Sequence, residues 1–195
     1  IAAFSLACGG NEPEPQPPVS PPVPKAVVDA GPPPSAANVK VRILAFNDFH
    51  GNLKPPTNKL PKMDQPVGGA SYFAAHLKKL AEGHPNTLVV AAGDLIGASP
   101  LTSGLFHDEP TIEVMNAIGL TASTIGNHEL DEGPDELLRM KKGGCHPKDG
   151  CKFEKDFPGA KFDYLAANVS VKASSSTLFP PYVVREVAGI PIAIV

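Results

Sequence analysis

Three short stretches of this 195-residue chain contain side chains of the types that bind divalent metal ions. They are Asp48-Phe49-His50, Gly93-Asp94 and Gly126-Asn127-His128-Glu129-Leu130-Asp131. Carboxylates and imidazoles are common ligands of zinc, manganese and similar ions. Asn and Asp favour turns anyway, but a turn between two hydrophobic elements does not need so many polar groups. The three stretches are therefore candidates for one metal-dependent site.

Each polar stretch directly follows a segment with the pattern of a β-strand, at residues 39–46, 87–92 and 121–125. A helical pattern over residues 68–80, and another beginning near Asp108, separate these segments, so the strands are expected to be parallel. The carboxyl ends of parallel strands meet at one edge of an open sheet, where ligands bind. We therefore expect the three polar stretches to converge at that edge.

In this order, the three stretches resemble the D-x-H…G-D…G-N-H-[DE] pattern of the calcineurin-like metallophosphoesterases. The extension Leu130-Asp131 resembles the branch that contains bacterial 5'-nucleotidases, 2',3'-cyclic phosphodiesterases and UDP-sugar hydrolases. The resemblance runs from about Val39 to Val195. It implies an α/β fold, namely part of a calcineurin-like αββα sandwich that is truncated before its sheet is complete.

The resemblance also implies two divalent metal ions, zinc, manganese or similar, as cofactors. By the family pattern, Asp48 and His50 would hold the first ion and Asp94 would bridge both ions. Asn127 would offer its amide oxygen to the second ion. The family's remaining ligands are histidines on later loops, which we expect beyond Val195, so this chain alone is expected to be inactive.

In the same resemblance, His128 and Asp131 are the catalytic residues. His128 would face the phosphate and either stabilise the transition state or protonate the leaving oxygen. Asp131 would orient the imidazole and favour its charged form. Glu129 is expected either to support a neighbouring group or to lie on the surface.

The N-terminal part differs in composition from the rest. Residues 1–10 resemble the end of an export signal, and Leu6-Ala7-Cys8 resembles a bacterial lipoprotein cleavage site with Cys8 as the lipidated residue. The alternative is an ordinary signal with an incidental cysteine. Residues 11–38 contain ten prolines and no aromatic residue, which predicts a disordered, extended linker. Residues 39–195 would form the phosphoesterase part, without the family's C-terminal nucleotide-binding domain.

Smaller features give further expectations. Cys145 and Cys151 are separated by five residues that include Pro and Gly, which favours a small disulfide loop over a metal site using His146. Asp108 is expected to be the N-cap of a helix, and His107 just before it is expected to be exposed. A strand is expected at residues 163–169 and a hairpin over residues 182–195.

The sequence leads to two classes of function. The first is an exported, membrane-tethered phosphohydrolase of the periplasm or cell envelope, acting on a nucleotide or a nucleotide sugar. UDP-sugar and 2',3'-cyclic nucleotide hydrolysis remain alternatives within that class. The second is a tethered binding protein on the same scaffold without turnover. The net charge of −3 does not suggest binding to a nucleic-acid polymer. The sequence contains no run of 18 apolar residues, which is the length that would indicate a membrane span.

Overall fold

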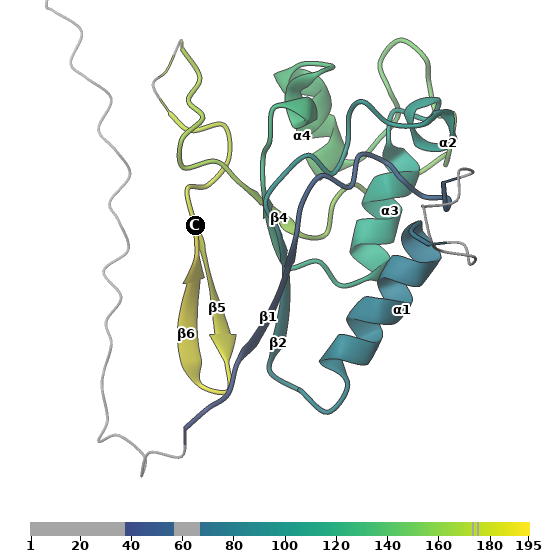
Figure 1. The fold of residues 1–195 in the computed structure, drawn as a ribbon. Coiled ribbons are helices and arrows are strands. Elements are labelled where there is room, and N and C mark those ends of the chain that lie inside the picture. Colours follow the sequence, from purple (N-terminus) through teal and green to yellow (C-terminus); the bar gives the residue numbers. More distant parts are fainter. Residues whose placement is uncertain (1–37, 57–66, 173, 175) are drawn as a thin grey trace, which may run out of the picture. The chain divides into compact units, whose positions relative to one another are not determined.

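The computed structural model describes residues 38–56, 67–172, 174 and 176–195 (Figure 1). The predicted export signal, Cys8 and residues 11–37 of the predicted linker lie outside the described residues. Among the helices of the described part, none is long and apolar enough to cross a membrane.

A parallel four-stranded sheet forms the centre of the described part (Figure 1). Its strands, in spatial order, are β1 (Arg42–Phe46), β2 (Thr87–Ala91), β3 (Ala122–Thr124) and β4 (Asp163–Leu165). Leu44 pairs with Val89, Val90 with Ala122, and Ser123 with Tyr164. The prediction of parallel strands is confirmed, so the loops that leave β1, β2 and β3 begin at the same edge.

Within the residues that the structure describes, four α-helices connect or follow these strands: α1 (Ala70–Ala81), α2 (Leu101–Gly104), α3 (Glu109–Ala117) and α4 (Pro134–Lys142). A short 3-10 helix, η1 (His128–Leu130), precedes α4. Pro occupies the first turn of both α3 and α4, where its missing N–H costs nothing. Gly143 ends α4 with a φ of 85°, which glycine adopts readily.

The core lies between the sheet and the helices. Leu95, Ile112, Met115, Leu137 and Met140 have no exposed surface. Burying such a side chain stabilises the fold by roughly 1.5–3 kcal/mol. On α1, Leu77 is buried, whereas Leu80 is 50% exposed.

Asp108 occupies the N-cap position of α3, as predicted, but its side chain makes no capping hydrogen bond. Its backbone is left-handed, with a φ of 60°, whereas a capping residue normally has an extended backbone. The carboxylate instead accepts hydrogen bonds from Ser103 Oγ at 2.5 Å and from the Gly97 amide at 3.0 Å. Asp108 thus joins the loop after β2 to the link between α2 and α3.

The predicted hairpin is confirmed as β5 (Val183–Val187) and β6 (Ile190–Ile194), which pair antiparallel. Both turn residues, Ala188 and Gly189, have positive φ values, as two-residue hairpin turns favour. Arg185 on β5 forms an ion pair with Asp163 on β4. The α/β class with a parallel sheet and a separate second sheet agrees with the expected fold.

Candidate active site

The loops after β1 and β2 are joined by backbone hydrogen bonds at the carboxyl edge of the sheet. The amides of Asp48, His50 and Gly51 donate to the carbonyls of Gly93, Asp94 and Leu95 at 3.2, 3.0 and 3.1 Å, respectively. Each of these three residues of the first loop is therefore held beside one residue of the second. This places the first two polar stretches of the sequence side by side.

Asp48, His50 and Asp94 converge at this edge, with one ligand atom from each within 4.8 Å of the others. His50 Nε2 lies 3.7 Å from Asp48 Oδ1. His50 Nδ1 lies 2.9 Å from the Gly97 carbonyl, which can only accept, so Nδ1 carries the proton. The lone pair of Nε2 then faces the two carboxylates, which is the arrangement that a metal-binding histidine needs.

All three of these residues have left-handed backbones. The φ values are 53° for Asp48, 45° for His50 and 53° for Asp94. Such conformations are uncommon for residues other than glycine, and they cluster at functional sites. The two loops adopt them where their backbones are hydrogen-bonded to each other, so the surrounding structure supports the strained geometry.

Two glycines allow the β2 and β3 loops to approach closely. A Cβ added at Gly93 would lie 2.5 Å from the Gly126 nitrogen, and one added at Gly126 would lie 2.8 Å from the Asp94 nitrogen. Both distances are too short for any side chain. The His128 amide can thereby donate to Asp94 Oδ1 at 3.0 Å.

Glu129 is buried behind this edge and does not lie on the surface. Its carboxylate accepts hydrogen bonds from the amides of Asp94 and Leu95, both at 2.8 Å, and of Gly126, at 2.6 Å. Burial raises the pKa of Glu129, while these hydrogen bonds act in the opposite direction. The sequence left two alternatives for Glu129, support of a neighbouring group or a place on the surface. The supporting role fits, because the Glu129 carboxylate connects the second and third loops.

His128 and Asp131 form a pair next to the three converging residues. His128 Nδ1 lies 2.8 Å from Asp131 Oδ2, and this hydrogen bond is the main reason that the pKa of His128 is raised. The His128 ring packs edge-to-face on His50, with 4.9 Å between centroids. Asn127 lies in the same loop with an exposed side chain, which makes no hydrogen bond to any described residue.

A family model described as calcineurin-like phosphoesterase matches residues 41–182. The chain belongs to this family. A protein of Acinetobacter calcoaceticus, described as an uncharacterized protein in the pqq-V 5' region, is 53% identical over 83% of this phosphoesterase chain and 86% of its own length. Endonuclease YhcR of Bacillus subtilis is 39% identical over 81% of this chain and 13% of its own length.

Among solved structures, the Haemophilus influenzae NAD nucleotidase is similar to this phosphoesterase. Its TM-score is 0.60 at 32% sequence identity, over 80% of this chain and 26% of the nucleotidase. The chain thus spans about a quarter of that enzyme and a smaller share of the endonuclease. The substrates named for these larger proteins therefore do not by themselves define what this chain acts on.

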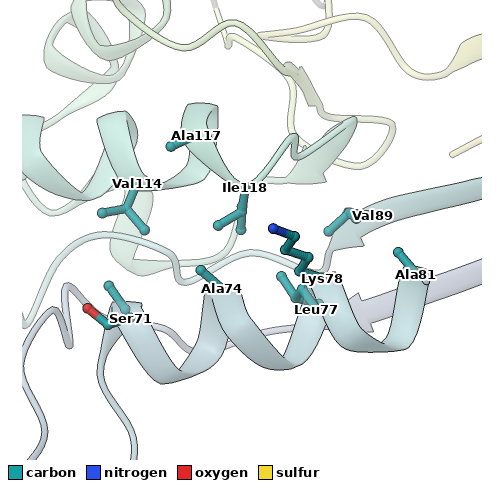
Figure 2. A pocket seen from close by; sticks show the side chains of 10 residues that line it. Ser71, Ala74, Leu77, Lys78, Ala81, Val89, Val114, Ala117 and Ile118 are labelled. Atoms are coloured by element: carbon teal, nitrogen blue, oxygen red, sulfur yellow. The ribbon is translucent and has the colours of Figure 1, made fainter.

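Two hollows differ in chemistry. A pocket of about 540 Å³ lies between α1 and α3 and is lined by apolar side chains such as Leu77, Val89 and Val114 (Figure 2). A smaller cavity of about 140 Å³ is lined by residues that include His128, Asp131 and His107. The smaller cavity lies beside the polar edge of the sheet, and the larger, apolar pocket does not. Pocket volume alone therefore does not identify the candidate active site in this protein.

The predicted disulfide between Cys145 and Cys151 is present, with 4.6 Å between the Cα atoms. The prediction that His107 is exposed is wrong, because only 14% of its side chain is accessible. Its ring stacks on that of His146, inside the disulfide loop, with 3.8 Å between centroids. Sequence reasoning missed this contact, since it depends on a distant loop folding back over the link between α2 and α3.

Proposed function

We propose that this chain forms part of a two-metal phosphohydrolase that releases phosphate from nucleotides. The observation that supports this most directly is the convergence of Asp48, His50 and Asp94 beside the His128–Asp131 pair. Two carboxylates and an imidazole with its Nε2 lone pair free form a set of ligands suited to zinc or manganese. The same residue types follow the three strands in the order that the family pattern requires.

In this proposal, Asp48 and His50 would hold one divalent ion, Asp94 would serve as a ligand of both ions and Asn127 would contribute to the second. Bound divalent ions would supply Lewis acidity, neutralise the phosphate charge and lower the pKa of water. The chain's own contribution is to hold these ligands rigidly. The paired loops, the glycine contact and the buried Glu129 carboxylate do so.

His128 is the proposed proton donor to the leaving oxygen. Its Nδ1 is engaged by Asp131, so Nε2 is the ring nitrogen available to a substrate. The carboxylate favours the imidazolium form, which is the form that can donate a proton or stabilise negative charge. Asp131 orients the ring rather than reacting itself.

The name of a similar solved structure supports phosphoesters of nucleotides as the substrates. The similar solved structure is named a NAD nucleotidase, which supports a mononucleotide or dinucleotide substrate. UDP-sugars and 2',3'-cyclic nucleotides stay as alternatives. A nucleic-acid polymer is a second candidate, because the relative at 39% identity is named an endonuclease, although the chain covers only 13% of it.

Phosphate release from AMP by the complete phosphohydrolase of which this chain is proposed to be a part, with Mn²⁺ or Zn²⁺ added, tests the proposal. UDP-glucose, 2',3'-cyclic AMP and single-stranded DNA serve as competing substrates. His128→Ala should keep its bound metal and lose about 10²–10⁴-fold in turnover, the usual contribution of one acid–base group. His76→Ala, at an exposed position on α1, is the matched control and should stay active. No hydrolysis of any of the four substrates would instead support a binding protein without turnover.

We also propose that the protein is exported and anchored to the cell envelope through lipid on Cys8. The disulfide between Cys145 and Cys151 supports an oxidising compartment, where such bonds persist. Mass spectrometry of protein purified from its native membrane should find the lipid on Cys8. An unmodified N-terminus cut at another residue would contradict the anchor and leave the proposed hydrolysis untouched.

A further inference from the structure

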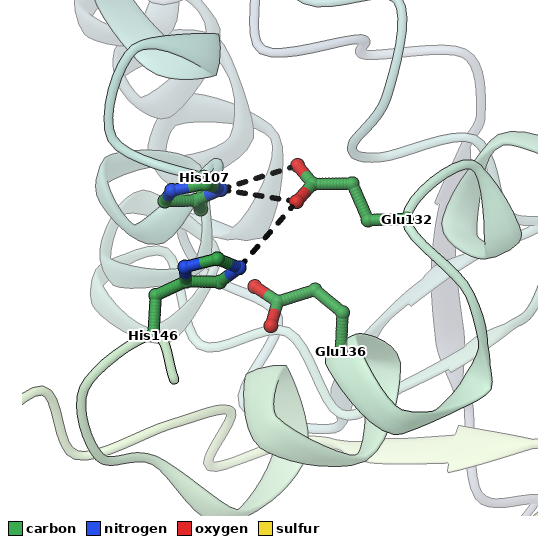
Figure 3. A group of neighbouring side chains, drawn as sticks. All are labelled: His107, Glu132, Glu136 and His146. Carbon is green, nitrogen blue, oxygen red and sulfur yellow. Dashed lines mark hydrogen bonds and ion pairs between the residues drawn. The ribbon is translucent and has the colours of Figure 1, made fainter. Parts of the chain in front are cut away.

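Four side chains outside the phosphoesterase ligands converge on a second point of the molecule. His107 comes from the link between α2 and α3. Glu132 comes from the turn before α4, and Glu136 comes from the first turn of α4. His146 comes from the disulfide loop. One nitrogen or oxygen of each lies within 4.8 Å of the corresponding atoms of the others. Figure 3 shows the two rings with a nitrogen each directed toward the glutamates.

Three of the four side chains are largely shielded from water. His107, His146 and Glu136 are 14%, 12% and 11% exposed, whereas Glu132 is 49% exposed. His107 Nδ1 lies 3.0 Å and His146 Nε2 lies 4.0 Å from the same oxygen of Glu132. A cation between these atoms would therefore have protein ligands on most sides and one side open to solvent.

The hydrogen bonds of His107 make it a suitable ligand. Its Nε2 lies 2.9 Å from Asp149 Oδ2, so Nε2 carries a proton that it donates to this carboxylate. A histidine that donates its second N–H to a carboxylate is the usual arrangement around a protein-bound metal. Nδ1 then faces Glu132, and a proton or a metal ion must lie between these two atoms.

The surrounding charges also favour a divalent cation. The ion pairs around the cluster involve four carboxylates and two cationic groups, namely Glu109, Glu132, Glu136, Asp149, Arg139 and Lys152. With neutral imidazoles, four negative and two positive charges leave a net charge of −2. One divalent ion would neutralise it.

We propose that His107, Glu132, Glu136 and His146 bind one divalent transition metal ion, with zinc as the best match. Zinc takes four nitrogen, oxygen or sulfur ligands, and imidazole and carboxylate ligands suit it. The ion joins three segments that are distant in sequence, one of which is closed by the disulfide. Glu132 directly follows Asp131, so the ion also holds the segment that positions His128. Its role is to support the structure next to the reactive edge.

Metal binding requires one change at His146. In the structure His146 Nδ1 accepts a hydrogen bond from the Asp149 amide at 3.1 Å, so the proton of a neutral ring lies on Nε2. To bind an ion through Nε2, the ring must carry its proton on Nδ1, which faces Asp149 Oδ2 at 3.7 Å. Zinc should therefore shift His146 from one neutral tautomer to the other, and nitrogen-15 NMR of the imidazole can detect this.

The test measures zinc per chain by elemental analysis of the whole chain, under non-reducing conditions and in a Cys8→Ser background. Because Cys145 and Cys151 form the disulfide and Cys8 is replaced by Ser, no cysteine thiol can bind zinc and add to the measured zinc content. The double variant His107→Gln/His146→Gln should lose one zinc per chain. Asp48→Asn, at the phosphoesterase edge, and His76→Ala, on the exposed face of α1, should both keep that ion.

Glu132→Gln provides a second variant, because Glu132 is the most exposed ligand and takes no part in the Arg139 ion pairs. Its Kd for zinc should rise at least about tenfold, the effect seen even for outer partners of metal ligands. Addition of zinc should also raise the Tm of the unchanged chain by more than that of the double variant, in which only the phosphoesterase edge can still bind zinc. A folded double variant with an unchanged zinc count, or a Glu132→Gln variant with unchanged affinity, would overturn the site.

Discussion

At the scale of single residues, the His128–Asp131 pair has a measurable electrostatic consequence. The hydrogen bond from His128 Nδ1 to Asp131 raises the pKa of the imidazole above its ordinary value of 6.5. The stability that this pair adds to the fold is fully present at pH values below the pKa of the histidine in the unfolded chain. It is lost as the pH rises through the higher pKa of the folded state.

We therefore expect Asp131→Asn to lower the pKa of His128 toward its ordinary value. The measurement is a proton NMR titration of the imidazole in chelator-treated protein, so that no metal ion contributes to the shift. Glu132→Gln is the matched control, because this neighbouring carboxylate contacts His107 and not His128. An unchanged His128 pKa in Asp131→Asn would show that the pair does not set the charge of the ring.

Asp94 differs from the other ligands in its position between two loops. It accepts the His128 amide from the β3 loop and lies beside Asp48 and His50 of the β1 loop. If it touches both ions, Asp94→Asn should lose more bound metal than Asp48→Asn or Asn127→Ala. Elemental analysis of the three purified variants decides this. Full metal content in Asp94→Asn would contradict the bridging role.

At the scale of elements, the site depends on loops whose backbones touch. Gly126→Ala places a methyl group against the Asp94 backbone, so the variant should lose roughly 1–3 kcal/mol of stability, as overpacked sites do, and much of its metal affinity. Gly119→Ala is the control, since Gly119 has a φ of 73° and open space around it. It should lose about 1 kcal/mol from backbone strain and keep its metal. Urea unfolding and metal titration of both variants separate the two effects.

The disulfide loop is the second element with a defined contribution. In the chain-entropy model, closing so short a loop stabilises the fold by about 2 kcal/mol. The double variant Cys145→Ser/Cys151→Ser should show that loss in its free energy of unfolding. Because the loop carries His146 and Asp149, the same variant should also bind zinc more weakly at the second cluster. A Cys8→Ser variant controls for loss of a thiol elsewhere.

At the scale of the whole molecule, the sequence predicts features that follow from local pattern and strand order, and it fails where a loop folds back over another element. Strand, turn and helix boundaries follow from short apolar runs and from residues such as Pro134 and Gly143, so the parallel sheet and the convergence at its edge could be predicted. Asp108 has the residue type of a cap, but its left-handed backbone removes that role. The burial of His107 depends on the disulfide loop, and its own neighbours in sequence carry no sign of it.

The left-handed backbones of Asp48, His50 and Asp94 have a consequence for how this scaffold can diverge. Glycine is the residue that adopts such conformations without strain, and each other residue costs on the order of 1 kcal/mol. Asp48→Gly or His50→Gly should therefore abolish hydrolysis and yet change the Tm of metal-free protein little, because the strain relieved roughly offsets the extra backbone entropy that glycine loses on folding. Once selection for turnover is relaxed, inactivating substitutions at these positions carry little penalty in folding. Stable descendants that have lost hydrolysis and retain the fold are then easy to reach from this sequence.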